Sequence, residues 1–141
     1  MSTAGRFAVI HVDGGARGNP GPAGIAAVLT GPDGALLAEE GRYMGEATNN
    51  VAEYRAVLLG LELARQAGVR ELEIVGDSEL VARQIGGQYK VKHEGLRPLH
   101  REVMEALRGF DSWSVRTVRR AQNARADALV NDALDAAGRT P

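Results

Sequence analysis

The sequence predicts an α/β protein in which a mixed β-sheet is flanked by helices, in one domain of residues 1–141. Two observations predict this class. The first third of the chain holds three β-branched and apolar runs joined by short turns, which is typical of an antiparallel meander. From about Asn50 the apolar residues recur at helical spacing, and helical and strand-like segments then alternate. The order β-β-β-α-β-α-α-β-α places antiparallel and parallel strands in one sheet.

The meander is predicted from three runs and one turn. Residues 6–15, RFAVIHVDGG, are β-branched and apolar and end in glycines, which predicts a strand buried on both faces. Residues 23–31 and 35–45 predict the second and third strands. The Gly-Pro-Asp-Gly sequence at 31–34 predicts the turn between them, because Pro, Asp and Gly favour turn geometry.

The rest of the chain alternates helices and strands. A helix is predicted from about Asn50 to Gly68, because apolar residues recur there at helical spacing: Tyr54, Val57, Leu58, Leu61 and Ala64. Residues 71–76 predict a fourth strand and residues 112–119 a fifth. Further helices are predicted at 78–87, at 96–110 with Pro98 near its first turn, and at 123–138.

The composition indicates a soluble globular protein, with 44% hydrophobic and 25% charged residues. No apolar run approaches the roughly 20 residues that span a bilayer, and the N-terminus lacks a secretory h-region. The absence of cysteine excludes disulfides and thiolate metal sites, and it is compatible with a reducing compartment. We therefore expect a cytoplasmic protein without membrane contact.

Charge is distributed unevenly, although the net charge of −1 does not predict a nucleic-acid partner by itself. Two segments are mostly basic: Arg83, Lys90, Lys92, Arg97 and Arg101, and then Arg116, Arg119, Arg120 and Arg125. Basic segments beside acids can hold a polyanion through metal ions and cationic side chains together. An ordinary solvated surface is the alternative interpretation.

The stretch VDGGARGNPGPAG, residues 12–24, holds five glycines, two prolines and one acid, Asp13. It lacks the Gly-Lys-Ser/Thr end of a nucleotide-phosphate loop and the glycine spacing of a dinucleotide fingerprint. Because Pro20 and Pro22 lead into another β-like run, the stretch predicts a hairpin between two strands. Asp13 then either serves a site or only stabilises the turn.

Two acids are predicted to meet at one edge of the sheet. Asp13 follows the first strand, and Asp77 follows the fourth. If these strands are parallel neighbours, both acids lie at the edge where α/β sheets bind ligands. The alternative for Asp77 is a helix N-cap.

Two further acids border apolar helix faces. Glu53 shares a face with Val57 and Leu61, and Asp127 shares one with Val130 and Leu134. Each has a structural alternative. Glu53 with Asn50 has the spacing of a capping box, and Asp127 suits a helix N-terminus through the macrodipole.

The four acids together suggest a shared site. Crowded carboxylates repel one another unless a cation joins them. Oxygen ligands without cysteine favour Mg²⁺ or Mn²⁺ over zinc. Two such ions about 4 Å apart can activate a water and stabilise a leaving oxygen in phosphodiester hydrolysis.

Four segments, in order, resemble the motifs of type 1 ribonuclease H: VDGGARGNPGPAG, TNNVAEYRA, VGDSELV and NARADALV. The resemblance covers almost the whole chain and implies a mixed five-stranded sheet, with three antiparallel strands and then two parallel ones. It implies an endonuclease that cuts the RNA strand of RNA–DNA hybrids with two Mg²⁺ or Mn²⁺ ions, leaving 5′-phosphate and 3′-hydroxyl ends. By motif match, the catalytic and metal-binding residues are Asp13, Glu53, Asp77 and Asp127.

The same motifs imply the substrate contacts. Residues of these segments would grip the minor groove and backbone of the hybrid: Gly14, Asn19, Thr48, Asn49, Asn50 and Ser78. A-form-like duplexes expose 2′-hydroxyls in a wide minor groove, which amide side chains and loop N–H groups can read. Helix capping is the alternative role for Asn49 and Asn50.

The chain departs from many relatives of this family at two places. A long basic protrusion after the second helix is reduced to residues 86–100, where Lys90, Lys92 and His93 remain, so hybrid binding should be more salt-sensitive. The loop VRRAQNARAD lacks the catalytic His of those relatives, and Arg119 and Arg120 are candidate helpers in its place.

The expected partner is an RNA–DNA hybrid, with double-stranded RNA as a further candidate substrate, and the expected state is a monomer. Two alternatives stay open: a same-fold DNA nuclease, and a non-catalytic module that binds hybrids. The GNPG and TNN sequences argue against the first. The presence of all four acids argues against the second.

Overall fold

The computed structural model describes residues 7–138, and these form a five-stranded sheet in the order β3-β2-β1-β4-β5. The strands are β1 (Phe7–Ala16), β2 (Gly21–Thr30), β3 (Leu36–Ala47), β4 (Glu71–Gly76) and β5 (Ser112–Thr117). The helices are α1 (Asn49–Gln66), α2 (Glu79–Ile85), α3 (Arg97–Leu107), the 3₁₀ turn η1 (Arg120–Asn123) and α4 (Ala124–Gly138). The predicted order of elements is confirmed. Residues 1–6 lie outside the described part of the chain. They include Arg6, the first residue of the predicted first strand, and most of the N-terminal segment in which no secretory h-region is expected.

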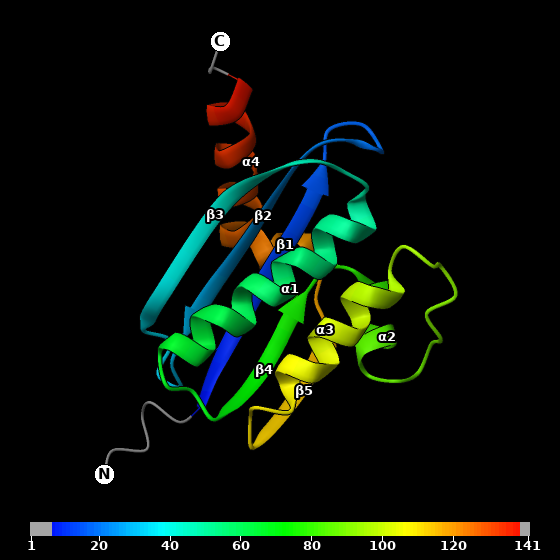
Figure 1. The fold of residues 1–141 in the computed structure, drawn as a ribbon. Coiled ribbons are helices and arrows are strands. Elements are labelled where there is room, and N and C mark those ends of the chain that lie inside the picture. The colour runs from blue at the N-terminus through cyan, green and yellow to red at the C-terminus, as the bar shows by residue number, and fades with distance from the viewer. Residues whose placement is uncertain (1–6, 139–141) are drawn as a thin grey trace.

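The sheet is mixed, as predicted. β1 pairs antiparallel with β2, and β2 pairs antiparallel with β3. β4 runs parallel to both β1 and β5, so the arrows of β1 and β4 point the same way in Figure 1. The carboxyl ends of β1, β4 and β5 therefore share one edge of the sheet.

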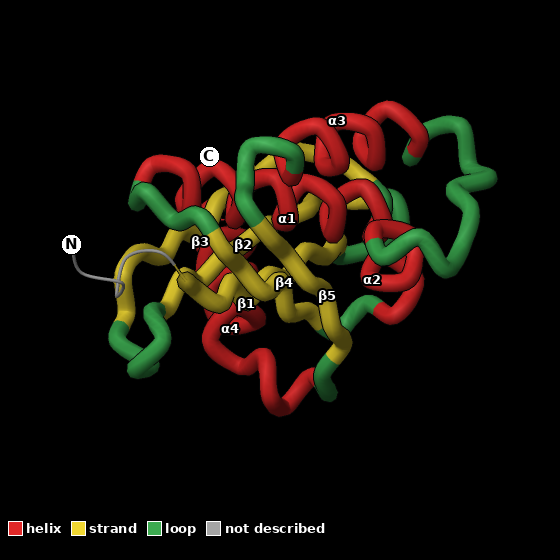
Figure 2. The backbone as a smooth tube through the Cα atoms, turned by 90° about the horizontal axis from the view of Figure 1, so that it is seen from below, coloured by secondary structure: helices red, strands yellow, loops and turns green. Residues whose placement is uncertain are grey.

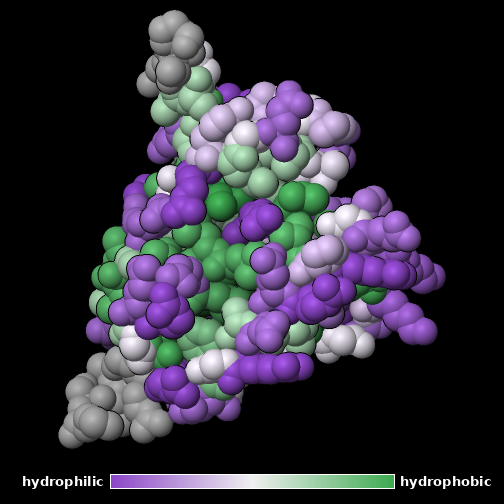
Figure 3. Space-filling view, viewed as in Figure 1, coloured by the Kyte–Doolittle hydropathy of each residue, from purple (hydrophilic) through white to green (hydrophobic). Residues whose placement is uncertain are grey.

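Helices cover both faces of the sheet, and Figure 2 shows α1, α2 and α3 on one side with α4 on the other. Alternation along the strands explains the two layers. Ile10 and Val12 of β1 belong to the core under α1, whereas Ala26 and Val28 of β2 pack against Val130 of α4. In Figure 3 apolar residues gather in the middle of the α1 face, with polar residues around them.

The prediction that the first strand is buried on both faces is wrong, and the second strand is buried in this way instead. In β1 the residues that face α1 are buried, but Val9 and His11 on the other face are only partly buried. In β2 every residue from Ala23 to Leu29 is buried. The reason is topological, since α4 lies over β2 and β3 more than over β1.

Several predicted boundaries also differ, and the helix predicted at 96–110 ends at Leu107. Both strands of the first hairpin extend into the glycine-rich stretch, so only residues 17–20 form the turn, with a cis peptide between Asn19 and Pro20. The fifth strand ends at Thr117 rather than at residue 119, and η1 intervenes before α4. None of the helices within residues 7–138 combines the length and the apolar character that a bilayer-spanning segment needs.

A buried polar network ties the segment after α2 to the core. The Tyr54 hydroxyl donates to Gln84 Oε1 at 2.6 Å, and Gln84 Nε2 donates to the Lys90 carbonyl at 3.5 Å. His100 Nε2 lies 3.1 Å from the Gln84 carbonyl oxygen, and its ring meets that of Tyr54 edge to face. Arg97 Nε also donates to the Val91 carbonyl. We call the segment of residues 86–95 the α2–α3 arm, and these contacts fix its first half.

Helix α1 packs closely on β1 because residue 60 is a glycine. A Cβ at Gly60 would lie 2.5 Å from Ile10 Cγ2 and 3.2 Å from Val12 Cγ1. Both methyl groups are buried and have no room to withdraw.

Replacing Gly60 by Ala should lower the free energy of unfolding by up to about 2 kcal/mol, because overpacking costs about 1–3 kcal/mol and the gain in helix propensity is roughly 1 kcal/mol. Urea unfolding followed by circular dichroism measures the change. The matched control is Gly138→Ala in α4, where an added Cβ meets nothing within 4 Å. A Gly60→Ala protein as stable as the control would contradict the packing.

Candidate functional site

Three acids predicted from the sequence meet at the carboxyl edge of the sheet. Asp13 belongs to the end of β1, Glu53 to the first half of α1, and Asp77 follows β4 directly. One carboxylate oxygen of each lies within 4.8 Å of the other two. Asp13 is only 7% exposed and Glu53 only 8%. Acids so deeply buried and so close together are rare without a function or a bound cation.

Asp127 lies beside this group. It sits in the first turn of α4, close enough for its negative charge to contribute to the raised pKa of Asp13. All four acids line one hollow of about 370 Å³. A larger groove of about 600 Å³ between α2 and β5 holds none of the four. The chemistry of the side chains, rather than the size of the cavity, therefore marks the candidate site.

The helix caps overturn two structural alternatives for these acids. The N-cap of α1 is Thr48, whose hydroxyl accepts from the Val51 N–H at 3.3 Å, so Asn50 and Glu53 form no capping box. The N-cap of α2 is Ser78, whose hydroxyl accepts from the Val81 N–H. Asp77 is therefore not the cap, and its carboxylate points to the cluster instead.

Gly14 allows the start of α1 to approach β1. Its N–H donates to Glu53 Oε1 at 3.2 Å. A Cβ at this position would lie 2.3 Å from the Ala52 carbonyl oxygen and 2.7 Å from the Glu53 backbone nitrogen. Only glycine fits between the strand and the helix, so residue 14 determines the separation of Asp13 and Glu53.

Burial and mutual repulsion raise the pKa values of two of the acids. Desolvation is the largest cause for Asp13, followed by the charges of Asp77 and Asp127, and they raise its pKa to about 7. Desolvation and then the charges of Asp13 and Asp77 raise the pKa of Glu53 to about 9. Both acids are poised to exchange a proton for a cation.

The donor set fits a hard divalent cation. Every candidate ligand atom in the cluster is a carboxylate oxygen, and the chain has no cysteine. Oxygen donors of this kind suit Mg²⁺ or Mn²⁺. A cation would also relieve the repulsion that raises the pKa values of Asp13 and Glu53.

Two asparagines join the hairpin turn to α1. The Asn49 N–H donates to Asn19 Oδ1 at 3.0 Å, and Asn49 Oδ1 accepts from the Ala16 N–H at 2.8 Å. Both side chains are exposed, and within residues 7–138 neither NH₂ group has a protein partner. Thr48 and Asn50 are exposed beside them. The capping alternative for Asn49 and Asn50 is wrong, because Thr48 is the cap.

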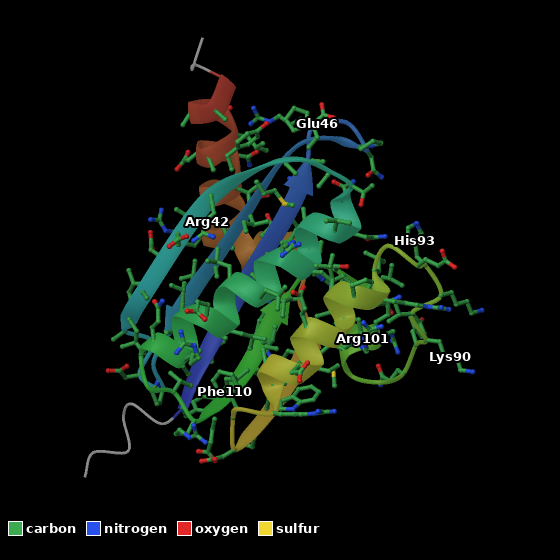
Figure 4. The ribbon with its side chains drawn as sticks, viewed as in Figure 1. Arg42, Glu46, Lys90, His93, Arg101 and Phe110 are labelled. Carbon is green, nitrogen blue, oxygen red and sulfur yellow. The ribbon has the colours of Figure 1, made fainter. Side chains whose placement is uncertain are left out.

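The structure separates the two candidate helpers. Arg120 Nη2 donates to Asp127 Oδ1 at 3.2 Å, and Arg120 lines the hollow. Arg119 instead precedes η1, where its N–H donates to Gln122 Oε1. Lys90 and His93 lie on the α2–α3 arm at the side of the molecule, as Figure 4 shows.

Sequence reasoning missed two residues around the acids. Asn123 is 1% exposed, and its Nδ2 donates to the carbonyl of Val12, the residue before Asp13. It thereby fixes the start of α4 to the end of β1. Arg17 of the hairpin turn also lines the hollow and reaches α4. The signal for Asn123 was its place in the NARADALV segment, whereas no local pattern indicates Arg17.

The chain is similar to known proteins over most of its length. A family model described as reverse transcriptase-like matches residues 11–133. Ribonuclease HI of Halobacterium salinarum is 47% identical over 125 residues, which are 89% of this chain and 63% of that protein. The bifunctional protein Rv2228c of Mycobacterium tuberculosis is 45% identical over 133 residues, 94% of this chain and 36% of that protein. The chain thus spans only part of the length of both relatives.

The fold of the chain is also similar to that of a solved structure. LC11-RNase H1, crystallised in complex with an RNA/DNA hybrid, superposes with a TM-score of 0.89 and 43% sequence identity. The match covers 92% of this chain and 98% of that one.

The raised pKa values predict how stability depends on pH without metal. Unfolded acids release their protons near pH 4, whereas folded Asp13 and Glu53 hold theirs to about pH 7 and about pH 9. In that window the folded state binds more protons, so stability should fall as pH rises from about 4 to about 9. Replacing Glu53 by Gln should raise the melting temperature at pH 8 in EDTA. Glu62→Gln, an exposed change on the same helix, should not, and equal effects of the two changes would contradict the prediction.

Proposed function

Since the chain belongs to the ribonuclease H family, we propose that it is an endoribonuclease that hydrolyses the RNA strand of RNA–DNA hybrids. The observation that carries the proposal is the meeting of three carboxylate oxygens within 4.8 Å, with Asp127 lining the same hollow beside them. A module that only binds nucleic acid would gain nothing from these buried, mutually repelling charges. The proposed unit is a monomer with one domain of residues 1–141.

The metal ligands in this proposal are Asp13, Glu53, Asp77 and Asp127. Their oxygens would hold two Mg²⁺ or Mn²⁺ ions. Ions bound there supply the activation of a water and the stabilisation of the leaving oxygen, which yields 5′-phosphate and 3′-hydroxyl ends. The Gly14 N–H keeps Glu53 Oε1 directed at the cluster.

Arg120 takes the role of the missing loop histidine. Its guanidinium is bound to Asp127 and lies at the rim of the hollow. There it orients the Asp127 carboxylate and offers a cation to the phosphate that leaves after cleavage. Arg119 does not line the hollow.

The hairpin turn and the start of α1 are the proposed reading surface for the minor groove. The NH₂ groups of Asn19 and Asn49 face outward while their oxygens hold the two segments together. Amide donors so placed suit the 2′-hydroxyls and base edges of an A-form-like duplex. Gly14, Thr48, Asn50 and Ser78 complete the proposed contacts.

Double-stranded RNA is a second substrate in this proposal, because the short α2–α3 arm leaves selectivity mainly to the minor-groove contacts. The cytoplasmic location expected from the sequence stays a prediction.

The protein should cut the labelled RNA strand of a hybrid in the presence of Mg²⁺ or Mn²⁺, and a chelator should abolish cutting. Denaturing gels with a DNA duplex, single-stranded RNA and double-stranded RNA as parallel substrates measure the preference. Asp77→Asn is the control, since it removes one ligand and one repelling charge, and it should fold but not cut. Cleavage of the DNA duplex alone would indicate a DNA nuclease. Hybrid binding without cleavage would indicate a binding module.

Replacing Arg120 by Ala should lower kcat by about 10–100-fold, the range typical of groups that orient a metal ligand. Arg119→Ala, the neighbouring change of equal charge, should stay close to the parent. Single-turnover rates on the hybrid measure the cleavage step, and steady-state rates also include product release. Equal loss in the two variants would mean that the basic run acts only through its charge.

A further inference from the structure

Arg17 links the hairpin turn to α4 across more than a hundred residues of chain. Its Nη1 lies 2.8 Å from Asp135 Oδ1, and its Nη2 donates to Asn131 Oδ1 at 3.4 Å. Asn131 Nδ2 in turn donates to the Asp127 carbonyl at 3.2 Å. Arg17 is therefore joined through Asn131 to the helical turn that carries one of the four acids.

The contacts of Arg17 lie along one side of α4. Asp127, Asn131 and Asp135 are spaced i, i+4, i+8, so they form a polar stripe about 12 Å long that leads away from the acid cluster. Arg120 binds the stripe at Asp127, and Arg17 binds it two turns farther on. Both arginines and Asn131 line the hollow that contains the four acids. A cation thus stands at each end of the stripe.

The partner of Arg17 is easily exchanged. The side chains of Arg17 and Asp135 are 49% and 48% exposed, and a pair so open to water is weakly held. A phosphate offers the same guanidinium a bidentate, charge-assisted contact, whereas Asp135 is contacted through Nη1 alone. A polyanion that lies over the hollow therefore competes with Asp135 for Arg17.

We propose that Arg17 is a backbone clamp for the nucleic acid, which exchanges Asp135 for a phosphate of the bound substrate beside the acid cluster. This inference rests on the proposed function and adds to it a specific contact outside the metal ligands. Asp135 keeps the guanidinium extended along α4 when no substrate is bound. The clamp therefore costs little ordering of the side chain on binding.

The first experiment compares Arg17→Gln with Arg65→Gln. Arg65 is an exposed arginine paired with a carboxylate at the far end of α1, so it matches the change in charge. Arg17→Gln should raise KM for the hybrid about 10-fold, as expected for a lost charge-assisted bond, and leave kcat close to the parent. The slope of log KM against log salt should fall by about one unit, which corresponds to one lost phosphate contact.

The second experiment removes the carboxylate of Asp135, which competes with phosphate for Arg17. Asp135→Asn should lower KM, and Asp132→Asn, a change of equal charge on α4, should lower it less. In the Arg17→Gln background the effect of Asp135→Asn should shrink to that of Asp132→Asn, since no clamp remains to be released. Fluorescence anisotropy with the hybrid in EDTA measures the same differences in binding without turnover.

The outcomes separate this inference from the proposed function. Uncut RNA with parent protein and metal refutes the proposed function, and the anisotropy series still tests Arg17. Equal salt slopes for Arg17→Gln and Arg65→Gln would overturn the clamp, and so would a loss confined to kcat. Additive effects of Arg17→Gln and Asp135→Asn would also overturn it.

Discussion

The geometry of the acid cluster depends on the contact between Gly14 and the first turns of α1. The Ala52 carbonyl occupies the space where any other residue would carry its Cβ, and the Gly14 N–H holds the carboxylate of the next helix residue. The strand and the helix therefore approach at a fixed distance. Asp13 and Glu53 become neighbours through this backbone contact rather than through any attraction between them. The asparagine pair at the hairpin turn secures the same approach from outside.

The packed core holds the acids together against their repulsion. Each of the three clustered acids adjoins a tightly packed element: Val12 precedes Asp13, Ala52 precedes Glu53, and Val75 lies two residues before Asp77. These neighbours are almost fully buried, so the backbone cannot withdraw to separate the charges. Asn123 holds the start of α4, which carries Asp127, against β1, because its amide donates to the Val12 carbonyl. The fold thus offsets an unfavourable local arrangement with distributed apolar burial, which is typical of functional sites.

The sequence predicted the layers and the acids because both follow from local periodicity. Alternation in β1 and β2 and the helical spacing after Asn50 are set by neighbours in the chain, and each acid stands at the end of such a pattern. Capping was harder to predict, because Thr48, Asn49 and Asn50 all suit an N-terminus, whereas in the fold Thr48 is the cap and Asn49 bonds to Asn19. Arg17 was beyond reach, since its partners on α4 depend on how the sheet and the last helix pack. Burial of β2 on both faces likewise depends on the position of α4.

The buried network of Tyr54, Gln84 and His100 determines which part of the α2–α3 arm can change in length. It fixes the α2–α3 arm at its base through the carbonyl of Lys90. Beyond Val91, His93 accepts two local hydrogen bonds, from the N–H groups of Gly95 and Leu96. Lengthening or shortening that outer segment changes loop-closure entropy by only about 0.6 kcal/mol per doubling of length. Insertions there leave the helix that carries Glu53 undisturbed. Under the proposed function, substrate binding by the arm and cleavage at the acid cluster can therefore diverge independently among proteins with this fold.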